Sequence, residues 1–114
     1  MHVNGYNLRM TRGDSETIHI SCENADGTPH PFQSGDTVYF TVKKDVNTAE
    51  ILLQKIITIF TETGAAQVEL APQDTRGLSY GGYKYDVQLS CADGQVMTIV
   101  PPNDFRIGGE VTYD

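Results

Sequence analysis

The chain has 114 residues, enough for one domain with a sizeable core, and 39% of them are hydrophobic. Its net charge of −7 comes from dispersed acidic residues, which argues against nucleic-acid binding because that affinity depends on clustered Lys and Arg. No apolar run approaches the ~20 residues that cross a bilayer, and the N-terminus has no signal-peptide pattern. We therefore expect a single domain over residues 1–114 that is made in a cytoplasm.

The first part of the chain is predicted to form three strands, at residues 6–10, 16–22 and 37–43. Turn sequences separate them. Asp26-Gly27 is typical of a tight reversal, because glycine supplies the positive φ that such turns need. In the third strand Val38, Phe40 and Val42 share one face. This alternation is typical of a strand with one buried face.

Residues 51–61 carry apolar side chains at both odd and even positions. This pattern indicates a bulge or a strand covered on both faces, and a helix over 48–56 is the competing interpretation. We favour a strand because β-branched residues dominate. Thr63-Gly64 then predicts a hairpin turn into a strand at 66–70.

The clearest alternation in the chain lies between Gly81 and Cys91. One face of this predicted strand is apolar and is expected to be buried, with Tyr83, Tyr85, Val87 and Leu89. The other face is polar, so the pattern predicts a long strand with one buried and one solvent-exposed face.

The segment before this strand predicts a corner between two sheets. Pro72–Leu78 is expected to form a single helical turn with Asp74 near its start. Asp74 followed by Tyr83 resembles the crossing in an immunoglobulin-like sandwich, where a tyrosine anchors the start of a central strand. We therefore assign Asp74 and Tyr83 to a structural corner.

The end of the chain predicts a hairpin at Ala92–Gly94 into a strand at 95–100, a break in pairing at Pro101-Pro102, and a last strand at 105–113. Seven or eight strands at 8–12-residue spacing, with no long helix, predict an all-β fold. We expect an immunoglobulin-like two-sheet antiparallel sandwich, and a small closed barrel is the alternative.

The two cysteines, Cys22 and Cys91, continue the inward positions of their predicted strands. In a reducing compartment we favour two buried thiols over a disulfide, although the sequence leaves open whether they pair. Neither has the spacing of a structural zinc site.

No group of residues predicts catalysis. His19 falls on the outward face of its strand, and His30 lies between two prolines in a loop. Asp86 is the acidic residue nearest to an apolar setting, and it also points outward. We expect no catalytic residue, cofactor or metal ion. Arg12-Gly13-Asp14 is interpreted as a tight turn before a strand.

Five segments in this order resemble a family of small phage and prophage proteins: Arg12–Ser15, Gly35–Lys44, Gly82–Leu89, Asp93-Gly94 and Thr98–Pro102. These proteins are similar to the N-terminal domain of the upper baseplate proteins of long-tailed phages. The resemblance implies an immunoglobulin-like β-sandwich in a virion or tail-tip assembly, without a catalytic role. It does not extend to the helical, receptor-binding-protein-anchoring region of a complete upper baseplate protein, because the sequence ends before such a region.

We therefore expect a non-enzymatic virion component, made in the bacterial cytoplasm, that docks other phage structural proteins or copies of itself. The expected surfaces are strand edges and the segments 38–44 and 105–113, which an incoming chain could pair with. The candidate contact residues are Tyr39, Lys43, Lys44 and Tyr113.

The alternative function is a carbohydrate-binding module used in host adsorption. Its sugar platform would be built from Tyr39, Tyr80 and Tyr113, because tyrosine rings give large rigid contacts at low entropic cost.

Overall fold

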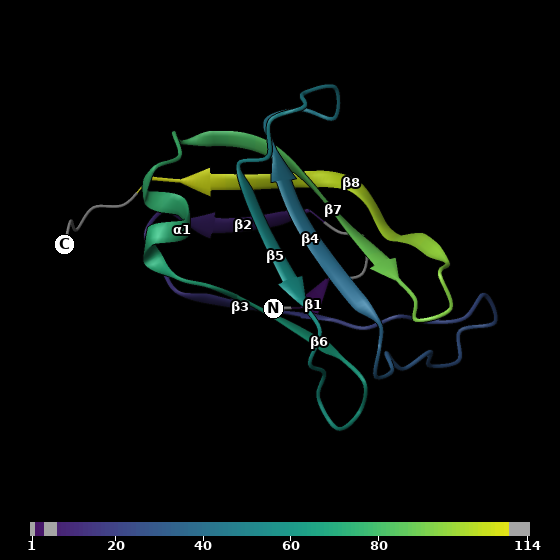
Figure 1. Cartoon of the computed structure of the whole chain (residues 1–114). Helices are drawn as coiled ribbons and strands as arrows, with labels where there is room; N and C mark the ends of the chain where they lie inside the picture. Colours follow the sequence, from purple (N-terminus) through teal and green to yellow (C-terminus); the bar gives the residue numbers. More distant parts are fainter. Residues whose placement is uncertain (1, 4–6, 110–114) are drawn as a thin grey trace.

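A computed structural model describes residues 2–3 and 7–109 of the chain. The described part contains eight strands and a short helix (Figure 1). In chain order they are β1 (His2–Val3), β2 (Leu8–Thr11), β3 (Glu16–Ile20), β4 (Thr37–Lys43), β5 (Leu53–Ile57), β6 (Ala66–Leu70), α1 (Pro72–Arg76), β7 (Gly81–Ser90) and β8 (Val96–Gly108). The strand predicted at 6–10 corresponds to β2, which begins at Leu8. Tyr6 lies outside the described residues.

The strands form two sheets, with orders β2-β8-β7-β4-β5 and β1-β3-β6. The prediction of a mostly β fold is confirmed, but the all-antiparallel arrangement is wrong. Strand β2 runs parallel to β8, and β1 runs parallel to β3. No hairpin joins β2 to β8, because they lie at opposite ends of the described chain, so no turn imposes an antiparallel direction on them.

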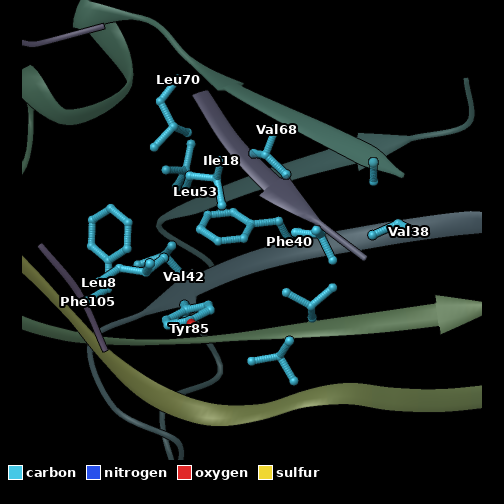
Figure 2. Packing of buried hydrophobic residues seen from close by; sticks show 14 of the residues in the cluster. Leu8, Ile18, Val38, Phe40, Val42, Leu53, Val68, Leu70, Tyr85 and Phe105 are labelled. Atoms are coloured by element: carbon cyan, nitrogen blue, oxygen red, sulfur yellow. The ribbon is translucent and has the colours of Figure 1, made fainter. Parts of the chain in front are cut away.

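The larger sheet curls into a half-barrel, and its edge strands, β2 and β5, do not meet (Figure 1). The described residues therefore form neither the closed barrel that was the alternative nor a clear immunoglobulin sandwich. Strands β3 and β6 lie against the open side of the curl, and the core fills the space between them (Figure 2).

Strand β7 follows its predicted alternation along its whole length. Its inward side chains are all buried: Tyr83, Tyr85, Val87 and Leu89. On β4 the predicted inward residues Val38, Phe40 and Val42 are also buried. These two strands pair side by side in the middle of the larger sheet, so their apolar faces form one continuous surface.

Three aromatic rings meet at the centre of this surface (Figure 2). The ring centroids of Phe40 and Tyr85 lie 5.5 Å apart, and Phe105 of β8 meets each of them edge-on at 6.2 and 6.4 Å. Edge-to-face packing at these separations adds to the gain from burial. Ile18 of β3 and Val68 of β6 approach the same cluster from the smaller sheet (Figure 2).

Residues 51–61 contain a strand, as predicted, and no helix. The turn at Thr63-Gly64 also forms, with a hydrogen bond from the Thr61 N–H to the Ala65 carbonyl at 2.9 Å and a Gly64 φ of 79°. The predicted hairpin is nevertheless wrong, because β6 pairs with β3 in the other sheet. A turn sequence reverses the chain, but buried contacts decide which strand the next segment joins.

The prolines at 101 and 102 bend the pairing of β8 with β7 without ending the strand. The ladder passes from Asn103, opposite Tyr85, to Val100, opposite Val87, and skips both prolines. The predicted break is thus a bulge inside one strand that runs from Val96 to Gly108. A bulge tolerates prolines because residues inside it need not donate to the ladder.

Strand β3 ends at Ile20, so the predicted extension to Cys22 does not form as regular strand.

A buried carboxylate joins two turns of the chain. The side chain of Asp36 accepts hydrogen bonds from the backbone N–H groups of Gln33 and Ala92, at 2.9 and 3.2 Å. These bonds connect the turn before β4 to the hairpin between β7 and β8.

The corner around α1 is held by side chains that bond to backbone. A carboxylate oxygen of Asp74 accepts the Ala71 N–H at 2.7 Å. Thr75 is fully buried, and its hydroxyl accepts the Gly13 N–H of the turn between β2 and β3 at 2.8 Å. The hydroxyl of Tyr83 donates to the Ser79 carbonyl four residues upstream at 2.7 Å, the bond typical of a tyrosine corner.

Replacing Tyr83 with Phe tests the contribution of this corner. We expect Tyr83→Phe to lower the free energy of unfolding by about 1 kcal/mol, because the ring still packs while the hydrogen bond is lost. Urea unfolding followed by circular dichroism measures the change. Tyr39→Phe on the outer face is the control and should change stability by less than about 0.5 kcal/mol. Equal midpoints for the Tyr83 variant and the wild type would contradict the assignment.

Candidate protein-docking surface

The free edge of β5 is an exposed apolar region of the described structure. In the larger sheet β5 pairs with β4 on one side and with no described strand on the other. Ile56 on this strand is 57% exposed, and Ile51 and Ile59, just beyond its two ends, are 49% and 85% exposed. We call Ile51, Ile56, Ile59 and the unpaired side of β5 the β5 edge.

The inward side of β5 explains why apolar residues appear at both parities in the sequence. Leu53 is buried in the core and Ile57 packs against it, whereas Ile56 faces outward. In the described part of the chain, β5 is therefore buried on its inner face only, and the prediction of a strand covered on both faces is wrong. The apolar residues at both parities belong to an exposed edge strand, not to the predicted bulge or doubly covered strand.

The single charged residue of β5 is turned away from the edge. The ammonium group of Lys55 forms an ion pair with Asp74 of α1 at 3.0 Å, and both side chains are largely shielded from solvent. Edge strands of natural proteins commonly carry exposed charges that prevent unwanted pairing. Here the lysine joins the sheet to the corner instead, so the β5 edge has no such protection.

The candidate contact residues of β4 occupy a different position from the one expected. Strand β4 lies between β5 and β7, so its backbone offers no free edge and the prediction of edge pairing there is wrong. Tyr39 is half-buried on the outer face and stands directly opposite Ile56 of β5. It therefore extends the apolar character of the β5 edge onto the outer face.

Lys43 and Lys44 lie at the far end of β4. Lys44 is exposed, and its ammonium group lies 4.7 Å from the centre of the Tyr83 ring and donates to the Gly82 carbonyl at 3.2 Å. Lys43 is half-buried and pairs in register with Lys84. These lysines are thus placed at the corner end of the sheet rather than along the β5 edge.

The segment 105–113 was also expected to contribute a surface. The part of this segment that belongs to β8, up to Gly108, lies between β2 and β7, so it has no free edge. Tyr113 lies outside the described residues. The first part of β8 is different, because β2 does not reach Val96–Val100 and the segment after β3 stands opposite it.

An open hollow of about 690 Å³ lies along this first part of β8. Its walls include Cys22, Glu23 and His30 on one side and Met97–Val100 on the other. The ring of His30 is hydrogen-bonded to Asn24 at 3.1 Å. The hollow is thus lined by a polar loop and a strand edge.

Tyr39 and Tyr80 do not form a common sugar platform. Tyr39 stands opposite Gln88, near the end of β7, whereas Tyr80 precedes the first residue of β7, so about 26 Å of strand separates the two tyrosines. The guanidinium of Arg12 also lies over the Tyr80 ring, 4.3 Å from its centre, and donates to its hydroxyl at 3.1 Å. One face of that ring is therefore occupied by the protein itself.

The Arg12-Gly13-Asp14 segment forms the predicted tight turn. The Asp14 N–H donates to the Thr11 carbonyl at 3.2 Å, and Gly13 has a φ of 85°. Because Arg12 contacts Tyr80 and Gly13 is bonded to Thr75, the turn is part of the corner.

Among the described residues, no three or more His, Cys, Asp or Glu side chains lie close enough to hold a metal ion. Burial raises the pKa of Asp86, and the nearby Lys43 partly opposes this effect.

In the described part of the chain, no helix has the length and apolar character that a membrane crossing requires.

The two cysteines are free thiols, and both are half-buried rather than fully buried as predicted. They follow the ends of β3 and β7, where the core thins out. Partial burial is the main cause that raises the pKa of Cys22, and the same cause, with Asp36 and Asp93, raises the pKa of Cys91. Both thiols therefore stay protonated at neutral pH and are weak nucleophiles.

No protein-family model matches the chain, and no curated protein matches it. Among solved structures, the fold is similar to the N-terminal domain of phage TP901-1 ORF48, with a TM-score of 0.51 and 15% sequence identity. The match covers 93% of this chain and 84% of that one. At this identity the likeness concerns the fold.

Acidification tests the ion pair that removes Lys55 from the β5 edge. Burial raises the pKa of Asp74, but the hydrogen bond from Ala71 and the pairing with Lys55 outweigh it and lower the pKa below its usual value. Because the folded pKa is lowered, the carboxylate stabilises the fold above the unfolded pKa, and this contribution disappears as pH falls through the folded pKa.

We expect Asp74→Ala to lower the free energy of unfolding by about 1–2 kcal/mol at pH 7. The difference from wild type should shrink as the pH falls below about 4, where the wild-type carboxylate also becomes neutral. Urea unfolding at several pH values measures both effects. Asp45→Ala, at an exposed loop position, is the control. A difference that stays constant with pH would contradict the role of the charge.

Proposed function

We propose that this protein is a non-enzymatic structural module of a phage or prophage virion, associated with the baseplate or tail, that acts through protein–protein contacts. The observation that carries the proposal is the likeness to the N-terminal domain of a phage protein over 93% of this chain. The sequence segments that resemble upper baseplate proteins point in the same direction. The module would be made in the bacterial cytoplasm and assembled there into particles.

The β5 edge supports a docking role. Exposed apolar patches beside an unpaired strand commonly mark surfaces that another protein covers. Ile56 and Ile59 are more than half exposed although the chain has a well-filled core elsewhere. An assembly component has a use for such an edge, because an incoming strand gains both backbone hydrogen bonds and apolar contacts.

The finer fold that goes with this proposal is a variant of the variable-type immunoglobulin domain. In such domains strands B and E lie in one sheet and C′, C, F and G in the other. Here β3 and β6 pair in one sheet, and β5, β4, β7 and β8 follow one another in the other, with the Tyr83 corner before β7. The parallel edge strands and the strong curl are the departures from that plan.

Purified particles from the bacterial strain that carries the gene provide the test. We expect the chain to appear in density-purified virions and to remain with the tail fraction when heads and tails are separated. Deletion of the gene should yield particles with defective tails, and the plasmid-borne gene should restore them. Particles that lack the chain, together with normal infectivity of the deletion strain, would overturn the proposal.

A further inference from the structure

We propose that the outer face of the larger sheet binds a short acidic segment of a partner protein through Arg9 and Arg106. We call these two residues the arginine pair. They lie on β2 and β8, at the side of the sheet opposite to β5, so this surface is separate from the β5 edge. The inference rests on the proposed function, because it gives the chemistry of one partner in the contacts that this function requires.

Strand pairing places the arginine pair side by side. Arg9 stands opposite Arg106 in the parallel ladder of β2 and β8, and adjacent strands lie about 4.8 Å apart. The chain neighbours of each arginine are buried, so both arginines point outward, and both are exposed. Arg106 in turn stands opposite Gly82 of β7, where a Cβ would lie 3.4 Å from a guanidinium nitrogen. The glycine therefore leaves the guanidinium uncovered on that side.

No acid within the described residues neutralises the arginine pair. The ion pairs of the larger sheet in this part of the chain join Lys55 to Asp74 and Lys84 to Asp104, and neither includes an arginine of the pair. Like charges on neighbouring strands repel each other. The free protein therefore carries an electrostatic cost that a bound anion would remove.

A second like-charge pair extends the positive region. Lys43 of β4 stands opposite Lys84 of β7, one row away on the same outer face. Half of the eight basic residues of the chain thus form two like-charge pairs on this face. The lysines have acidic neighbours, since Lys84 is bonded to Asp104 and Lys43 lies near Asp86. The arginine pair is therefore the part of the face that is left to bind an anion.

Charge complementarity indicates an acidic partner, and the surrounding charge limits its length. The whole chain has a net charge of −7 although it includes the arginine pair, so the rest of its surface is strongly acidic. A nucleic acid or another long polyanion would extend onto that surface and be repelled. A short acidic segment contacts the positive region alone.

The geometry of the arginine pair fits carboxylates on an extended segment. Each guanidinium presents a planar fork of N–H donors that can bind one carboxylate through two hydrogen bonds. Two acidic residues separated by one residue lie on the same side of an extended chain, about 6.8 Å apart. Two long arginine side chains on adjacent strands can reach both carboxylates together.

Fluorescence anisotropy of the purified chain with a fluorescein-labelled hexaglutamate peptide tests the proposal. We expect saturable binding at about 50 mM salt that weakens several-fold at about 300 mM, because salt screens the charges. The double variant Arg9→Gln/Arg106→Gln should weaken binding by about tenfold or more, since it removes two charge-assisted interactions.

The double variant Gln67→Glu/Gln95→Glu is the matched control. It changes the net charge by the same amount, with side chains of the same size. Both positions are exposed and lie away from the arginine pair, on β6 of the other sheet and in the hairpin at the far end of β7. This variant should lose less than about threefold in affinity at the same salt concentration, because screening weakens distant charges.

Three results with hexaglutamate would each overturn the proposal. These are a wild type that binds it no better than labelled hexaglutamine, an arginine variant that binds like the wild type, and a control that loses as much as the arginine variant. Circular dichroism spectra establish that each variant is folded, and Arg106→Gln alone replaces the double arginine variant if the latter unfolds.

Two further measurements decide against other occupants. Tighter binding of a labelled six-nucleotide single-stranded DNA than of hexaglutamate would identify a phosphate-bearing partner and overturn the proposal. A gain in hexaglutamate affinity in Glu110→Gln/Asp114→Asn would identify the acids at the end of this chain as the occupant, with the same consequence. None of these measurements involves phage particles, so a failure here is distinct from the absence of the chain from virions, which would overturn the proposed function.

Discussion

The packing of three aromatic rings between the two sheets is the constraint on which the rest of this structure depends. Phe40, Tyr85 and Phe105 come from three neighbouring strands of the larger sheet and touch one another. Their mutual contact requires β4, β7 and β8 to stay in register while the sheet curls. Burial raises the pKa of Tyr85 to about 12, so its phenol stays neutral inside the core.

The corner around α1 links this core to the surface. The same helix supplies Thr75, which receives the Gly13 N–H of the turn between β2 and β3, and Asp74, which holds Lys55 of β5. One short helix thus ties two distant parts of the chain, the turn between β2 and β3 and strand β5, to the corner. Its contact with Lys55 has a second consequence, because it withdraws from the β5 edge the charge that would otherwise protect it.

An unprotected apolar edge is a hazard for a free protein and an asset for an assembly component. The apolar side chains that β5 does not bury in its own core are the ones an added strand would cover. Such a surface suits a protein that spends its functional life in contact with neighbours.

The sequence by itself determined the strands whose side chains alternate over many residues. The inward residues of β4 and β7, the helical turn at Asp74 and the hairpin between β7 and β8 were all predictable, because local periodicity and turn chemistry encode them. Tyr39 could be proposed as a contact residue from its outward position alone.

Only the tertiary structure decided how these strands combine. Nothing local in the sequence says that β6 joins β3 instead of β5, that β2 runs parallel to β8, or that two prolines sit in a bulge of a continuous strand. The docking surface depends on the same information. Strand β5 became an edge, and β4 an interior strand, because long-range packing sets the order of strands in a sheet, whereas periodicity reports only which face of each strand is buried.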